Sequence, residues 1–336
     1  MKLLNLKSWA VAFVFVLAMS PARAQNGESS YMSPAVATEP ASTAAVQPTS
    51  SAQPDDAPIT TITKRVNEVN VFFTATDKHG KFVKHLNKSD FQVLDDHKPP
   101  QSIVDFRSET DLPLRVGLLV DSSGSVTSRF GFEQQAATQF LTQILRPGFD
   151  KAFVVGFNTK MQLTQDYTDN VASLSKGIER LQPGGGTALY DAIFHACHNK
   201  LLGLSHDQPI RKALIVLSDG EDNQSYVSLQ QAIAMAQRAE VIIYAISTDD
   251  SGLVMRGDGV LEQLAEATGG RAFFPFKMKD ITKSFGSIED ELRSQYIVAY
   301  RPAEFENDGR YRSIEIIAAN KNLHVRSRKG YYAPRQ

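Results

Sequence analysis

Three oxygen-bearing side chains follow an apolar stretch within residues 114–125, which read LRVGLLVDSSGS. Residues 115–120 form a nearly unbroken apolar run, typical of a strand that is covered on both faces of a parallel sheet. The run ends at Asp121, and Ser123 and Ser125 follow at alternate positions, so one turning loop can direct all three side chains toward one point. A carboxylate with neutral hydroxyls suits a hard cation such as Mg²⁺, whereas the softer ligands that favour zinc or copper are missing from this segment.

Taken alone, this D-x-S-x-S pattern has a simpler interpretation, in which a Ser/Gly turn follows the strand and Asp121 caps the next helix. Two later segments favour the metal site. Residues 182–191, QPGGGTALYD, place Thr187 between a Gly-rich loop and a helical pattern, and residues 214–222, LIVLSDGED, form a second apolar strand that ends at Asp219. Ligands of open α/β sheets bind at the carboxyl ends of the strands, where these donors are expected.

This set resembles the von Willebrand factor A (VWFA) domain family and its metal-ion-dependent adhesion site. The resemblance covers roughly residues 114–289, and the segment LEQLAEATGG (261–270) looks like the family's late helix. It implies a Rossmann-like fold, a divalent cation (Mg²⁺, or Mn²⁺ or Ca²⁺), and a partner protein that offers an Asp or Glu carboxylate to that cation. The matching positions imply these ligands: Asp121, Ser123, Ser125, Thr187 and Asp219.

The elements around these residues alternate between strand and helix patterns, which predicts an α/β fold with a doubly wound, mostly parallel sheet and right-handed crossovers. A short edge strand is expected near residues 161–165. A long polar loop is expected over residues 249–259, followed by a helix over 260–268. The tripeptide Arg256-Gly257-Asp258 falls within that loop, and three such common residues arise easily by chance.

The segments that flank this region show strand patterns and little helix signal. Residues 69–76 alternate as in a strand, residues 82–83 are expected to begin a second one, and three strands are expected after residue 294. A few strands without a helix do not form a stable domain alone, so we expect both segments to pair into one β-sandwich-like unit. The chain also looks like secreted bacterial proteins in which an A domain is inserted between β segments.

The N-terminus predicts export. Lys2 and Lys7 precede an apolar run over residues 9–19, and Ala22-Arg23-Ala24 provides a signal-peptide cleavage site. The run is too short to span a bilayer, so no membrane anchor is expected after cleavage, and the protein is expected in the periplasm or outside the cell. The predicted organisation is a signal peptide (1–24), a disordered Ser/Ala/Pro/Thr linker (25–60), a β-rich segment (61–110), the A domain (111–293) and a C-terminal β segment (294–336).

The composition limits the classes of function that the protein can have. A net charge of −1 provides no basic field for nucleic acid, and 42% hydrophobic residues support an ordinary globular core. Cys197 is the single cysteine, so no internal disulfide is expected, and its place on a predicted helix favours a buried thiol.

Three functions remain open: a non-enzymatic, adhesion-type protein-binding module, a metal-independent structural protein of the cell envelope, and a metal-dependent hydrolase. We expect the binding module. A hydrolase would need a general base near the ion, and only Glu221 and Asp222 lie close in sequence. The G-x-S-x-G elbow of serine hydrolases is absent. Helical spacing of Asp191, His195 and His198 allows a zinc site, but the opposite side of that helix is apolar, so the two histidines are expected to face solvent.

Overall fold

The computed structural model describes residues 68–108, 111–204, 209–249, 251, 253 and 255–335. The predicted signal peptide and linker lie outside these ranges. The predicted boundaries between the β segments and the A domain stay predictions. Over the described residues, no helix combines the length and the apolar character needed to cross a membrane.

A six-stranded sheet with the order β6-β5-β4-β7-β8-β9 forms the centre of the larger region. All neighbours in it are parallel except β5 and β6, so the predicted edge strand is the antiparallel one. Every residue of β7 is buried, as expected for a strand in the middle of a doubly covered sheet. The strands are β4 (Leu114–Asp121), β5 (Lys151–Phe157), β6 (Met161–Thr168), β7 (Arg211–Ser218), β8 (Ile242–Ser247) and β9 (Ala272–Phe273).

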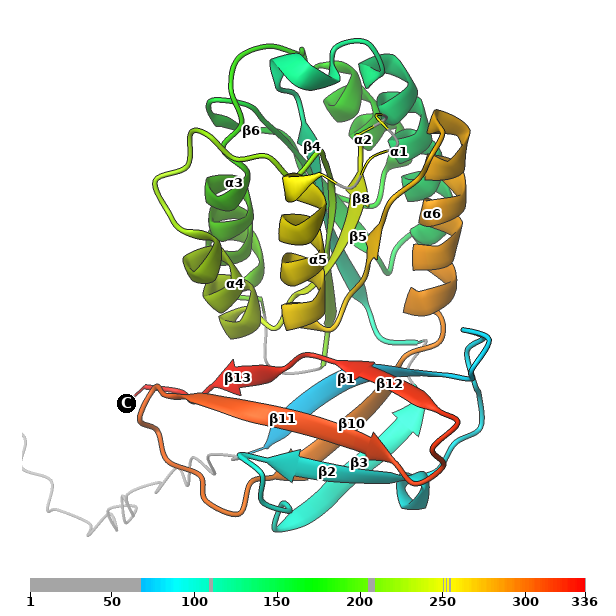
Figure 1. The fold of residues 1–336 in the computed structure, drawn as a ribbon, viewed down its shortest axis with the longest axis vertical. Helices are drawn as coiled ribbons and strands as arrows, with labels where there is room; N and C mark the ends of the chain where they lie inside the picture. Colours follow the sequence, from blue (N-terminus) through cyan, green and yellow to red (C-terminus); the bar gives the residue numbers. More distant parts are fainter. Residues whose placement is uncertain are drawn as a thin grey trace, which may run out of the picture. The chain divides into compact units, whose positions relative to one another are not determined.

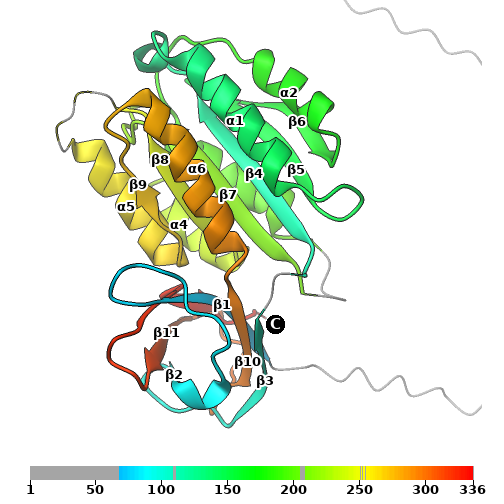
Figure 2. The ribbon, with the colours of Figure 1, turned by 90° about the vertical axis from the view of Figure 1, so that its right-hand side faces the viewer.

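Helices cover both faces of this sheet (Figures 1 and 2). One face packs against α1, α2 and α6, and the other against α3, α4 and α5, each through its own apolar cluster. The predicted fold class, an α/β sheet flanked by helices, is therefore confirmed. The helices are α1 (Phe130–Ile144), α2 (Val171–Glu179), α3 (Leu189–Ala196, continued by a π-helical turn Cys197–Leu201), α4 (Leu229–Arg238), α5 (Arg256–Thr268) and α6 (Met278–Leu292), with 3-10 turns at Lys88–Asp90 and Gly124–Val126.

The two flanking segments build two further antiparallel sheets together, with the orders β12-β1-β10-β3 and β13-β11-β2. An aromatic cluster of Phe73, Phe91, Phe106 and Tyr296 fills the space between them. The predicted pairing of both ends of the chain into one β unit is confirmed. Its strands are β1 (Val69–Thr76), β2 (Phe91–Asp95), β3 (Ser102–Ser108), β10 (Tyr296–Arg301), β11 (Tyr311–Ala318), β12 (His324–Ser327) and β13 (Gly330–Tyr332).

Three local predictions were wrong. Helix α5 begins at Arg256, four residues before the expected start, because the Asp258 carboxylate accepts a hydrogen bond from the Met255 backbone N–H and closes the first turn. Phe82 forms only an isolated bridge to Thr76, so residues 82–83 start no strand. The chain after residue 294 contains four strands, because Gly330–Tyr332 pairs with the beginning of β11.

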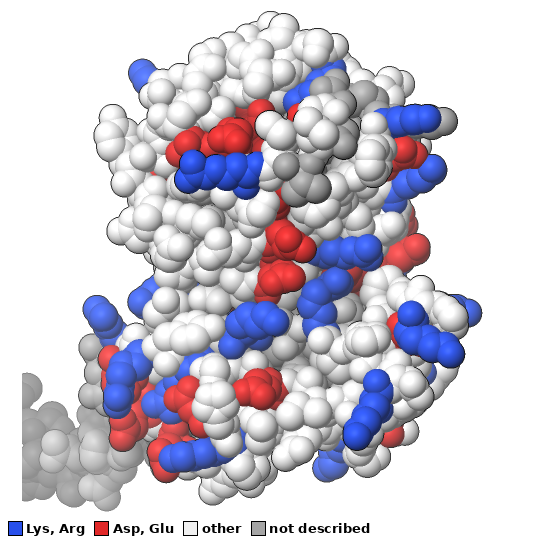
Figure 3. Space-filling view, in the orientation of Figure 1, with Lys and Arg blue, Asp and Glu red and all other residues white. Residues whose placement is uncertain are grey.

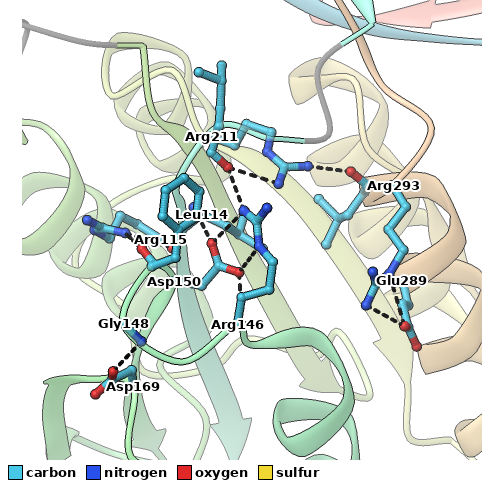
Figure 4. A network of polar contacts seen from close by, with 12 residues as sticks. Leu114, Arg115, Arg146, Gly148, Asp150, Asp169, Arg211, Glu289 and Arg293 are labelled. Carbon is cyan, nitrogen blue, oxygen red and sulfur yellow. Dashed lines mark hydrogen bonds and ion pairs between the residues drawn. The ribbon is translucent and has the colours of Figure 1, made fainter.

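A network of hydrogen bonds connects the segment through which the chain enters the larger region with the segment through which it leaves (Figure 4). The Arg211 guanidinium donates hydrogen bonds to the carbonyl oxygens of Leu112 and Leu292, which lie at the two ends of this region. Arg146 donates to the same Leu112 oxygen at 2.9 Å and to the buried carboxylate of Asp150. These bonds hold in place the two segments that connect the larger region to the β unit. Both segments lie at the amino ends of the parallel strands, at the opposite edge of the sheet from the carboxyl ends of β4 and β7.

On the face of the molecule shown in Figure 3, charged side chains of both signs are mixed. In the view of Figure 3, Lys and Arg alternate with Asp and Glu over the β unit, and long stretches above it are uncharged. This distribution agrees with the net charge of −1 and gives no basic surface for a polyanion on this face.

Candidate metal centre

The loop after β4 is built around the carboxylate of Asp121. This side chain is fully buried at the end of the strand. One carboxylate oxygen accepts a hydrogen bond from the Ser123 backbone N–H at 2.8 Å, and the other accepts one from the Ser218 hydroxyl at 2.6 Å. These two bonds fix the orientation of the carboxylate before any ligand binds.

A chain of hydrogen bonds connects this loop to the end of β7. The hydroxyl oxygens of Ser123 and Ser125 lie 3.0 Å apart, and the Ser125 hydroxyl donates to Oδ2 of Asp219 at 2.8 Å. The other carboxylate oxygen of Asp219 accepts from the Glu221 backbone N–H. Ser123 is buried, whereas Ser125 is exposed and Asp219 half-buried, so the cluster opens to solvent on one side.

The Gly-rich loop lies against the same residues. Gly184 donates its N–H to the Ser122 carbonyl at 2.8 Å, and Gly124 donates its N–H to the Gly185 carbonyl at 3.1 Å. Gly185 has a φ of +85°, and a Cβ there would lie 2.8 Å from the hydroxyl of Thr159, so this close approach requires glycine. Thr187 follows directly after this loop and is buried.

Thr187 is held by the loop that follows Asp219. Its backbone N–H donates to the side-chain oxygen of Asn223, and its carbonyl accepts from the backbone N–H groups of Asn223 and Gln224. The loops after β4 and β7 and the Gly-rich loop thus form one assembly. The structure joins four of the predicted ligands, Asp121, Ser123, Ser125 and Asp219, through hydrogen bonds. The fifth, Thr187, is connected to the loop after Asp219 through its backbone.

The electrostatics of this assembly disfavour the ionised form of Asp121. Burial, with a smaller contribution from the negative charge of Asp219, raises the pKa of the Asp121 carboxyl to about 6. Over the described part of the chain, no Lys, Arg or His forms an ion pair with either aspartate. A bound cation would offset both the cost of desolvating the Asp121 carboxylate and its repulsion from Asp219.

The donor set fits a hard divalent cation. Two carboxylates offset its charge, and the hydroxyls of Ser123, Ser125 and Thr187 supply neutral oxygens of the kind that Mg²⁺ and Mn²⁺ accept alongside water. Among the described residues, no three His, Cys, Asp or Glu side chains gather into a group that could hold a metal. A cation here would depend on hydroxyls and on water or an outside ligand.

Ser218 and Asn223 were missed by the sequence analysis. Ser218 orients Asp121, and Asn223 holds the backbone of Thr187. A signal for the first existed, since Ser218 is a polar residue at the end of the otherwise apolar run LIVLS. No local pattern pointed to Asn223, because its partner lies 36 positions away.

The other polar residues that the sequence suggested as candidate site residues have different surroundings. The Asp191 carboxylate accepts hydrogen bonds from the backbone of Tyr226 and Val227, and both His195 and His198 are exposed. The expectation that the two histidines face solvent is confirmed. The Asp222 carboxylate accepts from the Tyr190 N–H and the Ser225 hydroxyl, which holds the start of α3 in place.

Cys197 is fully buried at the start of the π-helical turn, and burial raises the pKa of its thiol. The folded protein should therefore leave this thiol unreacted with a disulfide reagent at pH 8, whereas the denatured chain should release one equivalent. Absorbance with and without guanidinium measures the difference. Rapid reaction of the native protein would contradict the burial of this side chain.

Slightly more than half of the chain matches a known protein family. The family model described as von Willebrand factor type A domain matches residues 116–291. A curated UPF0353 protein of Mycolicibacterium paratuberculosis (strain ATCC BAA-968 / K-10) is 25% identical over 199 residues, covering 52% of this chain and 60% of that protein. The chain thus matches about three fifths of the length of that relative.

Solved structures with a similar arrangement include a von Willebrand factor type A protein from Catenulispora acidiphila. It is 12% identical, with a TM-score of 0.47, and the match covers 80% of this chain and 74% of that one. Another is proximal thread matrix protein 1 from the mussel byssus, described with a zinc-occupied MIDAS motif. It is 18% identical, with a TM-score of 0.47, and the match covers 58% of this chain and 50% of that one.

Proposed function

Because the chain belongs to the von Willebrand factor type A domain family, we propose that it is a non-enzymatic, adhesion-type module that binds a partner protein through a divalent cation. The residues that would hold the cation are Asp121, Ser123, Ser125, Thr187 and Asp219. When bound, the cation would supply a positive charge and an open coordination position for a carboxylate oxygen of the partner.

The observation that carries this proposal is the continuous polar chain from Ser218 through Asp121 and Ser123 to Ser125 and Asp219. It orients hard oxygen donors before binding, so little ordering entropy remains to be lost. Ser125 and Asp219 form its solvent-facing side. A partner's Asp or Glu approaching there would form a charge-assisted contact in a partly dry interface.

A hydrolytic function has less support. A general base must reach a metal-activated water by a direct or water-mediated hydrogen bond. Asp222 is already an acceptor for the start of α3, and Glu221 is exposed on the loop after Asp219. We therefore propose that the site binds without catalysing a reaction.

We also propose that the protein is exported, to the periplasm or the outside of the cell. Support comes from the signal-peptide pattern that ends at Ala24. A metal-independent structural role in the envelope is the competing proposal, and metal titration separates the two.

Calorimetric titration with MgCl₂ and MnCl₂, together with thermal melts, tests the metal site. We expect heat of binding and a melting temperature that rises with metal concentration. Ser123→Ala should weaken binding only modestly, because water can replace a hydroxyl ligand. Thr142→Ala, which removes a helix-surface hydroxyl remote from the site, is the matched control and should leave binding unchanged. If the wild-type protein shows neither heat of binding nor a melting shift at millimolar metal, the metal-dependent function is wrong and the metal-independent structural role remains.

A further inference from the structure

A cavity of about 240 Å³ lies inside the β unit, at the side where β2 and β3 are the outermost strands of their sheets. Among the described residues, β3 pairs only with β10 and β2 only with β11, so no hydrogen-bonded strand connects the two sheets on this side. Both strands lie at the lower end of the β unit in Figures 1 and 2. Every residue that lines the cavity belongs to the described ranges, and none of them takes part in the metal centre.

The inner end of the cavity is apolar and shielded from water. Phe73, Val93, Val298 and Ile316 line it, and each of these side chains is 9% exposed or less. The rings of Phe73 and Phe91, whose centroids lie 5.0 Å apart, form part of the same wall. Protein interiors are close-packed and leave few spaces larger than a water molecule. A space of this size among core side chains is therefore available to a ligand.

The volume and the lining limit the chemistry of that ligand. An apolar cavity of about 150 Å³ lined by aliphatic and aromatic side chains binds benzene, so about 240 Å³ provides room for roughly ten carbon atoms. Pro99 and Pro100, in the connection from β2 to β3, also line the cavity and have no backbone N–H to donate. The part of the ligand that enters the cavity is therefore a hydrocarbon of medium length.

The mouth of the cavity carries a single charge. Lys88 is the one charged residue in the lining, and both Lys88 and the neutral Gln92 are exposed. Within the described ranges, the Lys88 ammonium forms no ion pair and no hydrogen bond. The acidic residues nearby already have partners, since the Asp90 carboxylate accepts a backbone N–H of its own turn at 2.7 Å and Asp105 pairs with Arg107 at 3.2 Å. The mouth therefore favours an anionic group.

We propose that this cavity binds a small anion with an apolar tail, of which the medium-chain fatty acids are the simplest members. The tail occupies the space between the two sheets, and the carboxylate lies at the mouth beside the Lys88 ammonium and solvent. A cationic ligand with the same tail would be repelled at the mouth. This site needs no metal ion, so the inference goes beyond the proposed metal-dependent function and stands independently of it.

Calorimetric titration of the full chain with sodium alkanoates of increasing length tests the apolar part of the site. We expect the affinity to rise about fourfold for each methylene added from hexanoate to about decanoate, because each one is buried, and to level off once the cavity is full. Octylamine should bind more weakly than octanoate. The affinity for octanoate should be the same in EDTA and in MgCl₂.

Methyl NMR spectra recorded during the octanoate titration test the location. The methyl signals of Val93, Val298 and Ile316 should shift, because these side chains line the cavity. The methyl signals of Ile215, which is buried in the central sheet, should not shift and serve as the internal control.

Two pairs of variants test the two parts of the site. Ile103→Phe places a larger side chain in the cavity and should weaken octanoate binding by roughly tenfold or more without lowering the melting temperature. Val104→Phe adds the same ring at the next position of β3, where the side chain is 45% exposed and outside the cavity lining, and should leave binding unchanged. Lys88→Gln should weaken octanoate binding about threefold, because an exposed charge pair contributes little. Lys176→Gln, which removes an exposed ammonium of α2, is its matched control.

The outcomes that would overturn this proposal are distinct from those of the metal titration. Absence of saturable alkanoate binding, an affinity that still rises beyond dodecanoate, or full binding by Ile103→Phe would each show that the cavity does not hold the tail. Cosedimentation with phosphatidylglycerol vesicles that Ile103→Phe abolishes, without binding of soluble alkanoates, would assign the cavity to a membrane lipid and contradict the proposed ligand. Any of these results leaves the metal-dependent function standing, and a failed Mg²⁺ titration leaves the alkanoate site standing.

Discussion

Asp121→Asn should stabilise the metal-free protein at pH 8 and at the same time abolish its response to Mg²⁺. The Asp121 carboxylate is fully buried, and its pKa is raised from 3.8 to about 6. At pH 8 the folded protein must hold it ionised, which costs about 3 kcal/mol relative to the unfolded chain. Asparagine keeps the acceptor for the Ser123 N–H and a partner for Ser218, but it carries no charge.

The sign of the pH dependence follows from the direction of this shift. The folded state binds the Asp121 proton more tightly than the unfolded state, so the wild-type protein loses stability as pH rises from about 4 to about 6. Above that window the penalty is constant. The stability advantage of Asp121→Asn should therefore be large at pH 8 and nearly absent at pH 4.

Metal should reverse the order of the two proteins. A ligand that binds only the folded state adds about 2.7 kcal/mol at a concentration one hundred times its Kd. The wild-type protein should gain this stabilisation from Mg²⁺, whereas the Asn variant, with one carboxylate left, should gain almost none. Chemical denaturation in EDTA and in MgCl₂, at pH 4, 6 and 8, measures all three effects.

Asp290→Asn is the matched control, since this carboxylate is exposed on α6 and should show neither effect. An Asn variant that is less stable than the wild-type protein in EDTA at pH 8 would show that the ionised carboxylate is not strained. An Asn variant that still responds fully to Mg²⁺ would remove Asp121 from the ligand set.

The central sheet could be predicted because each of its strands is indicated by a pattern within a short segment of the sequence. Apolar runs such as residues 115–120 and 214–217 show strands that are buried on both faces, and polar residues at their ends mark one edge of the sheet. Asp121, Ser123 and Ser125 are neighbours in sequence, so their convergence required only a turn. Thr187 and Asp219 stood out in their own segments, and the family pattern assigned them to the same site as Asp121.

The details that the sequence did not predict depend on partners far away in the chain. Ser218 donates to a carboxylate 97 positions earlier, and Gly257, in the first turn of α5, lies against the backbone of Asp219 and Gly220 in the loop after β7. Strand β13 has three residues, too few for an alternation to be read.

Neither flanking segment should fold without the other. In the described residues, β1 pairs only with β10 and β12, β3 pairs only with β10, and β2 pairs only with β11. Each strand from the N-terminal side therefore has all its neighbours on the C-terminal side. Removing the C-terminal segment would expose every edge of these strands and the aromatic cluster around Phe73.

We therefore expect a peptide of residues 61–110 to show no cooperative melt when its circular dichroism is followed with temperature. We also expect a chain that ends at residue 293 to lose hydrogen-exchange protection throughout β1, β2 and β3. Val71 and Phe73, which face the core of the β unit, should become as exchangeable as an unstructured peptide. Leu118 and Ile215 in the central sheet are the internal control, because their apolar contacts come from α1, α2 and α6. If the peptide melts cooperatively, or if protection persists in β1 of the shortened chain, the N-terminal strands hold structure of their own and the β unit is not shared.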